Sequence, residues 1–286
     1  MIFAYPLASF LECCWRESLA VFSGVFMSVR SGYILRALNL VLAVMQIAVT
    51  IVAFEIGPSF NQATAFSAGE PPIIPAGYAF AIWTVIYAGS LIYGVFQLTR
   101  NRAQDLLLQR IRPFTASAFL ATVCWLIAAR FNLTGLTVIC MLWLLGSLLP
   151  VFMSFMTPKS RLSAVQQFAM VIPLSIYTGW VTVAVFADLS AFLYRHGILD
   201  ILLTPAGWAV AFLIVAGLIA AWLTFRSAST PFALTICWAL IAILVANLTR
   251  EKHPTVVICC AAMTATQLLA LALSKRSQAA EAPAGF

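Results

Sequence analysis

An aromatic stripe early in the chain has the spacing needed to hold a flat ligand. A proline-rich segment, residues 71–75, leads into an uncharged apolar stretch that contains Phe80, Trp83 and Tyr87. Their spacing of i, i+3 and i+7 puts the three rings on one face of a helix. Such a face is either ordinary helix packing or the wall of a site for a flat hydrophobic molecule.

A second stretch repeats this pattern about a hundred residues later. Tyr177, Trp180, Ala184 and Asp188 share one helix face, and Gly179 leaves room beside the rings. Aromatic walls with a few polar tips and small gaps are how proteins hold flat apolar ligands. Trp125 and Trp143 fall in the two apolar stretches between these patterns.

Composition places these elements in a lipid bilayer. Apolar residues make up 63% of the chain and charged residues 9%, with a mean hydropathy of +1.01. Soluble proteins carry about 25% charged residues. Eight stretches are long enough to cross the bilayer as helices, which need about 20 residues each. These predicted spans are residues 37–54, 77–98, 114–129, 134–156, 168–187, 206–225, 232–248 and 254–273.

The expected fold is an all-α, polytopic membrane helical bundle, because a spanning helix satisfies its own backbone and nothing here alternates like barrel strands. Most of the 16 Lys and Arg residues fall on one side of this topology, and only Arg130, Arg195, Arg250 and Lys252 fall on the other. Both termini are therefore predicted to be cytoplasmic, with the protein in the cell (inner) membrane. The net charge of +7 then reflects topology and contact with anionic lipids, not nucleic acid.

The two ends of the chain are predicted to lie outside the bundle. Residues 1–36 contain charged side chains among apolar ones and lack the pattern of a secretory signal, which leaves an interfacial helix or a physiological start at Met27 as alternatives. Residues 274–286 are rich in Ala and small polar residues and are predicted to be a disordered tail.

The sequence offers little for catalysis, metal binding or ion coupling. Five of the seven cysteines fall inside spans without a CxxC pair, and His196 and His253 lie in loops, so no metal site and no catalytic residue is predicted. No cofactor motif is present. Charges at the span ends, Glu55 and Asp188, are read as solvated helix ends, which argues against an ion-coupled transporter.

The chain resembles the TspO/MBR family of translocator proteins, also called tryptophan-rich sensory proteins. The second span is similar to the family's loop-to-helix pattern of prolines, an aromatic, Trp-Thr and Tyr. The fifth span is similar to its pattern of Pro, an aromatic, Trp-Val, a small residue and Phe-Ala, and the third shares its Trp. The matching residues are Trp83, Thr84, Tyr87, Trp125, Pro173, Tyr177, Trp180, Val181, Ala184, Phe186 and Ala187.

The resemblance implies a five-helix bundle that binds porphyrins and other apolar ligands beneath the loop after its first helix. Some family members are reported to break down protoporphyrin in light, using tryptophans that match Trp83 and Trp180. This chain differs at Asp188, where small members usually have Asn, and it continues for three further helices. The expected ligand-binding residues are Pro75, Phe80, Trp83, Tyr87, Trp125, Trp143, Tyr177, Trp180, Ala184 and Asp188.

These features predict an enlarged TspO-like protein. Residues 37–188 form a five-helix unit, and residues 189–273 form three helices packed against it as an appendage. The leading hypothesis is a membrane binding or sensory protein for a flat hydrophobic ligand, a tetrapyrrole such as protoporphyrin or a lipid. A facilitator of small apolar metabolites is the alternative, and an enzyme acting on a tetrapyrrole or lipid is a third. A tetrapyrrole would be a ligand, not a resident cofactor, and a homo-oligomer stays open.

Overall fold

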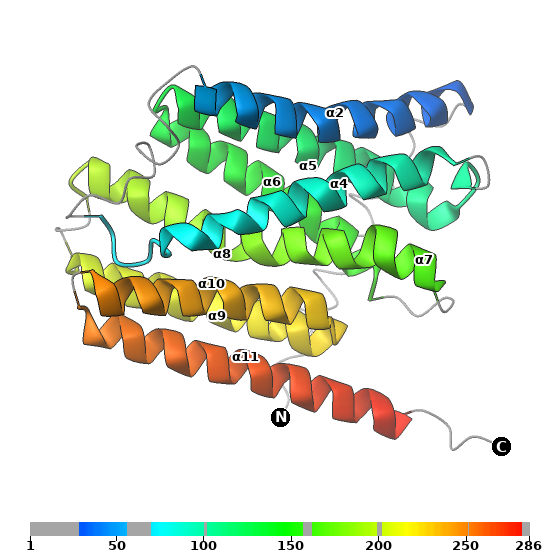
Figure 1. Cartoon of the computed structure of the whole chain (residues 1–286). Helices are drawn as coiled ribbons and strands as arrows, with labels where there is room; N and C mark the ends of the chain where they lie inside the picture. The colour runs from blue at the N-terminus through cyan, green and yellow to red at the C-terminus, as the bar shows by residue number, and fades with distance from the viewer. Residues whose placement is uncertain are drawn as a thin grey trace.

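The computed structural model describes residues 29–55, 70–99, 102–156, 162–198, 202–250 and 252–281, and within them it is all-α without a strand. The N-terminal segment, including the choice between Met1 and Met27, lies outside the described residues. The elements are α2 (Val29–Glu55), η1 (Gly77–Ala81), α4 (Ile82–Leu98), α5 (Leu106–Arg130), α6 (Thr134–Ser154), α7 (Ala164–Gln166), η3 (Gln167–Val171), α8 (Ile172–Arg195), α9 (Pro205–Ser227), α10 (Thr230–Thr249) and α11 (Pro254–Glu281) (Figure 1).

Eight spans in the described part of the chain are long and apolar enough to cross a membrane, which confirms the predicted helical membrane bundle. The second span, Gly77–Leu98, has the predicted bounds, although its first turn is the 3-10 helix η1. The last span is longer than expected. Since α11 continues to Glu281, residues 274–281 of the predicted tail are helical.

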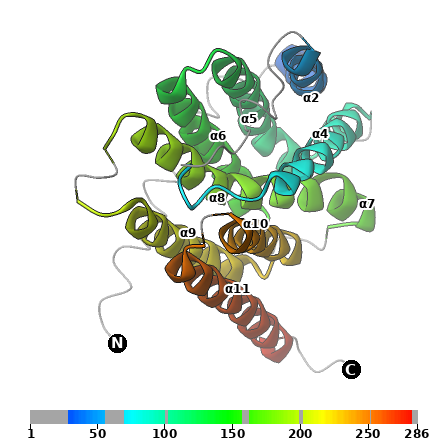
Figure 2. The same cartoon turned by 60° about the vertical axis from the view of Figure 1, so that its left-hand side comes forward.

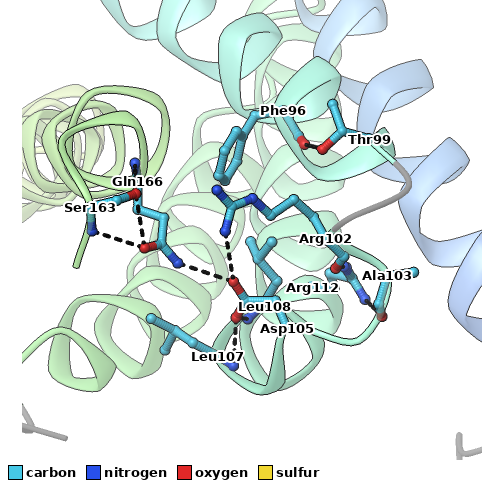
Figure 3. Close-up of polar contacts among 10 residues, drawn as sticks. All are labelled: Phe96, Thr99, Arg102, Ala103, Asp105, Leu107, Leu108, Arg112, Ser163 and Gln166. Carbon is cyan, nitrogen blue, oxygen red and sulfur yellow. Dashed lines mark hydrogen bonds and ion pairs between the residues drawn. The ribbon is translucent and has the colours of Figure 1, made fainter. Parts of the chain in front are cut away.

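The third span also begins earlier than predicted, and its true start buries an arginine. The Asp105 carboxylate accepts from the backbone N–H groups of Leu107 and Leu108 and so caps α5. Arg112, expected in a loop, lies inside the helix and is only 2% exposed. Its guanidinium donates to the carbonyl oxygens of Arg102 (2.6 Å) and Ala103 (3.4 Å), which partly offsets the cost of burial (Figure 3).

The residue that caps α5, Asp105, is also hydrogen-bonded to the start of the fifth span. Gln166 donates from Nε2 to the Asp105 carboxylate (3.0 Å) and forms a capping box with Ser163 (Figure 3). The helix then passes through a π-helical stretch, η3, before α8 begins at Ile172, with Pro173 in its first turn. A β-carbon on Gly89 of α4 would lie 2.7 Å from Pro173 Cβ, so only glycine permits α4 to approach this closely.

Helix α8 is the central element of the bundle. It contacts α4 and α6 on one side and α9 and α10 on the other (Figure 2). In an 18-residue apolar stretch of its span, Ala164–Arg195, 72% of the residues are buried. The corresponding stretches of α2 and α11, which lie at the two outer edges, are 22% and 17% buried. A division after residue 188 would fall inside α8. The two-unit division of the chain stays a prediction.

Candidate functional site

Four aromatic rings from α4, α5 and α8 contact Trp83, and Phe80 of η1 contacts one of them, Trp180. We call these six residues the aromatic cluster: Phe80, Trp83, Tyr87, Trp125, Tyr177 and Trp180. The cluster brings together residues that the sequence analysis had placed on three separate spans. Trp83, Trp125 and Trp180 are 6%, 8% and 3% exposed. They therefore lie inside the bundle and not in an interfacial belt.

The geometry around Trp83 is that of interlocked rings. Trp83 stacks on Trp125, with centroids 5.3 Å apart and planes at 21°. Tyr177 and Trp180 present their edges to it at 6.0 and 6.4 Å, both near 83°. Offset stacks and edge-to-face pairs are the arrangements that aromatic quadrupoles favour. Trp83 thus stacks on one ring and has two further rings nearly perpendicular to it.

Polar side chains hold the two tyrosines in place. The Tyr177 hydroxyl donates to Gln46 Oε1 (3.0 Å) and is hydrogen-bonded to the Thr122 hydroxyl. The Tyr87 hydroxyl accepts from Thr50 Oγ1 at 3.2 Å. Sequence reasoning missed Gln46, Thr50 and Thr122. An amide inside an otherwise apolar span is costly, so Gln46 carried a signal that could have been used.

Several N–H donors of the cluster have no acceptor. The indole Nε1 atoms of Trp83, Trp125 and Trp180 are buried without a hydrogen-bond partner, as is the Nε2 atom of Gln46. Leaving a buried donor unpaired costs about 1–3 kcal/mol. Buried groups of this kind in a native structure call for an explanation, and a ligand that accepts hydrogen bonds would supply one.

The remaining predicted site residues lie at different distances from the cluster. Trp143 is 40% exposed and donates to Ser117 Oγ (2.9 Å), so it does not join the cluster. Ala184 is partly buried one turn beyond Trp180. Asp188 lies a further turn away inside α8, with a buried Oδ2 atom that lacks a partner, so its prediction as a solvated helix end was wrong.

The segment before α4, residues 70–81, leads directly into the cluster, and we call it the entrance segment. Its Ile73 and Ala79 are fully buried, and Phe80 at its end meets the edge of Trp180 at 5.9 Å. Pro75 is buried as well, and its carbonyl oxygen accepts from Arg250. Residues 56–69, the rest of the loop predicted to cover the site, lie outside the described residues.

Helix α10 contributes side chains to the entrance segment that sequence reasoning did not select. Trp238 and Asn247 donate to its backbone carbonyls, and Arg250, just after the helix, does the same. Nothing along α10 itself indicates the contact, because the partners lie more than 150 residues away in sequence.

A carboxylate lies at the start of the entrance segment. Partial burial raises the pKa of Glu70 above its usual 4.5, while Arg250 and then Arg195 act in the opposite direction. Its Oε2 atom is buried without a hydrogen-bond partner. The protonated, neutral form of Glu70 is therefore favoured more than it would be in water.

The described residues contain no group of three or more His, Cys, Asp and Glu side chains placed to hold a metal ion. Five cysteines among them, Cys124, Cys140, Cys237, Cys259 and Cys260, are free thiols. The side chains of the cluster present aromatic surfaces and neutral hydrogen-bond donors.

The sequence matches a known protein family. A family model described as TSPO-like protein matches residues 36–273. No curated protein and no solved structure was found to match the chain. The match covers most of the chain and runs through all eight spans from α2 to α11. The chain is therefore a multi-pass membrane protein that belongs to the TSPO-like family.

Proposed function

We propose that this protein binds a flat hydrophobic ligand at the aromatic cluster, as a membrane binding or sensory protein. The observation that carries the proposal is the meeting of Trp83, Trp125 and Trp180 from three helices, buried and with unpaired N–H groups. A packed core alone gives no reason to keep three unpaired indole donors together, since phenylalanine would avoid their cost.

The ligand class we propose is a tetrapyrrole such as protoporphyrin, or a lipid with a planar ring system. A large flat ring gains from stacking on indole faces, and its polar edge can accept from the free indole N–H groups. Membership of the TSPO-like family supports a hydrophobic ligand without naming it.

The proposed orientation has both termini in the cytoplasm and the entrance segment on the opposite side. Support comes from the bias of Lys and Arg across the eight spans. A ligand would then reach the cluster from the extracytoplasmic leaflet or from the space beyond it.

Tryptophan quenching by protoporphyrin IX in detergent tests the proposal. We expect saturable quenching in the parent. Trp83→Leu and Trp180→Leu should each weaken binding about five- to tenfold, because a stacking contact of this kind is worth on the order of 1 kcal/mol. The control is Trp222→Leu, since Trp222 lies on α9 and is 55% exposed. If both cluster variants bind as tightly as the parent, the cluster is ordinary packing.

The same preparation separates binding from the alternatives. A binder or sensor should show saturable quenching without flux, whereas a facilitator should move the probe across the membrane of reconstituted vesicles. An enzyme should consume the probe, which absorption spectra taken in light and in darkness would record. Flux that Trp83→Leu abolishes would favour the facilitator.

A further inference from the structure

The entrance segment depends on donors from elsewhere because of its composition. Proline has no backbone N–H, so a segment with prolines at 71, 72 and 75 cannot pair its own carbonyl groups as a helix does. Buried carbonyl groups need partners. Asn247 Nδ2 donates to the Pro72 oxygen (2.7 Å), and Arg250 donates to the Pro75 oxygen (2.9 Å).

Two more contacts continue along the segment toward the aromatic cluster. The backbone N–H of Ala76 donates to the Ala242 oxygen of α10 (3.0 Å), and Trp238 Nε1 donates to the Ala79 oxygen (3.2 Å). The Trp238 ring also meets Tyr78 edge-on at 5.5 Å. Helix α10, together with Arg250 just after it, thus holds the entrance segment at successive points from Pro72 to Ala79.

We propose that α10 is part of the ligand site, and that Trp238, Asn247 and Arg250 are positioning residues that set the place of Phe80 and Trp83. The proposal rests on the function proposed for the aromatic cluster. It assigns α10 a role in binding, whereas an appendage of α9, α10 and α11 would leave binding unchanged.

Helix α10 also contacts α8, the helix that carries Trp180. Phe80 follows Ala79, the residue that Trp238 holds, and its ring faces Trp180. On α8, Gly179 next to Trp180 lies so close to α10 that a β-carbon there would be 3.0 Å from the Phe232 oxygen. Helix α10 therefore contacts both elements that carry the Phe80–Trp180 pair, and a shift of α10 would change the space between these rings.

Asn247→Ala and Trp238→Phe test the proposal in the full-length chain. Asn247→Ala removes the donor to Pro72, and Trp238→Phe removes the indole N–H while keeping a ring beside Tyr78. Thr249→Ala is the matched control, because the Thr249 hydroxyl donates only to carbonyls of its own helix. The first readout is hydrogen–deuterium exchange of the entrance segment, which needs no ligand. The second is the rate of protoporphyrin IX association and release by stopped-flow quenching.

We expect the amides of residues 73–80 to exchange about three- to tenfold faster in Asn247→Ala and Trp238→Phe, with no change in Thr249→Ala. Association and release of the porphyrin should both accelerate in the same two variants. A general loss of stability would instead speed exchange in every helix and lower the unfolding temperature, without a selective change in the rates.

Each other outcome overturns a defined part of the proposal. Unchanged exchange in both variants would show that α10 does not anchor the segment. Faster exchange with parental rates of association and release would show that the anchor does not position the site. If the parent itself does not bind the porphyrin, the proposed function fails, and the exchange experiment still decides whether α10 anchors the segment.

Discussion

At the scale of residues, Glu70 of the entrance segment has a pKa that folding changes. Burial raises its pKa above 4.5, and the attraction of Arg250 and Arg195 is the smaller effect. In the folded protein the charged form therefore costs stability. That cost is absent below pH 4.5, where Glu70 is protonated in the folded and unfolded chain, and it appears as the pH rises through the higher folded pKa.

Glu70→Gln should therefore stabilise the protein at neutral pH and not in acid. We expect a higher unfolding temperature in detergent than the parent at pH 7, and the difference should vanish below about pH 4.5. The effect should be small, since the side chain is partly exposed. A lower unfolding temperature for the variant at pH 7 would mean that attraction by Arg250 and Arg195 outweighs burial.

Residue types and spacing predicted the rings of the cluster, but not what holds them. Phe80, Trp83 and Trp180 could be chosen because helical periodicity shows which rings share a face. Gln46 and Thr122 were not chosen, since the value of a lone polar side chain depends on which helix lies opposite. Trp143 lies outside the cluster, which its span gave no means to foresee, and its role in ligand binding stays a prediction.

At the scale of elements, the approach of α8 to α10 depends on a single glycine. A β-carbon at Gly179 would lie 3.0 Å from both the Phe232 oxygen and Thr235 Cβ. Contacts this short require the neighbours to move by a few tenths of an ångström, and neither neighbour is the end of a flexible side chain. The glycine at position 179 therefore favours the close approach of the two helices at the depth of Trp180.

Gly179→Ala should separate α8 from α10 and destabilise the protein by about 1–3 kcal/mol, as overpacking does. The expected readout is a lower unfolding temperature together with weaker porphyrin quenching. Gly146→Ala in α6 is the control, since the added carbon would meet no packing neighbour within 4 Å apart from the backbone around it. That control should be neutral or slightly stabilising. Equal effects of the two changes would contradict close packing at Gly179.

Hydropathy predicted all eight spanning elements, yet their ends followed local chemistry that hydropathy does not register. The third span begins at Leu106 because Asp105 caps it and because nearby carbonyls accept from the buried Arg112. Because an arginine lowers the mean hydropathy, the start of this helix was expected to be a loop. The contacts of α10 with the entrance segment were beyond prediction, because one sequence does not reveal which spans are neighbours.

At the scale of the whole molecule, the eight spans place two equally exposed leucines at opposite ends of the bundle. Leu106 begins α5, and Leu202 lies between α8 and α9, and each is 79% exposed. The proposed orientation puts Leu106 in the cytoplasm and Leu202 outside it. The pair is therefore a matched probe of topology.

In a background with silent native cysteines, Leu202→Cys should react with an impermeant maleimide in intact cells, and Leu106→Cys only after lysis. Equal exposure of the two positions removes accessibility as an explanation for a difference. The reverse labelling pattern would invert the orientation and place the entrance segment in the cytoplasm.

The closeness of Trp83, Trp125 and Trp180 also has a consequence for fluorescence. Trp83 stacks on Trp125, and Trp180 lies edge-on at 6.4 Å. Indoles this close can transfer excitation energy to one another before they emit. We therefore expect the proposed ligand, bound against one ring, to quench the emission of its neighbours as well. Fluorescence therefore reports occupancy of the cluster as a whole, and the contributions of single rings have to come from affinities and not from signal size.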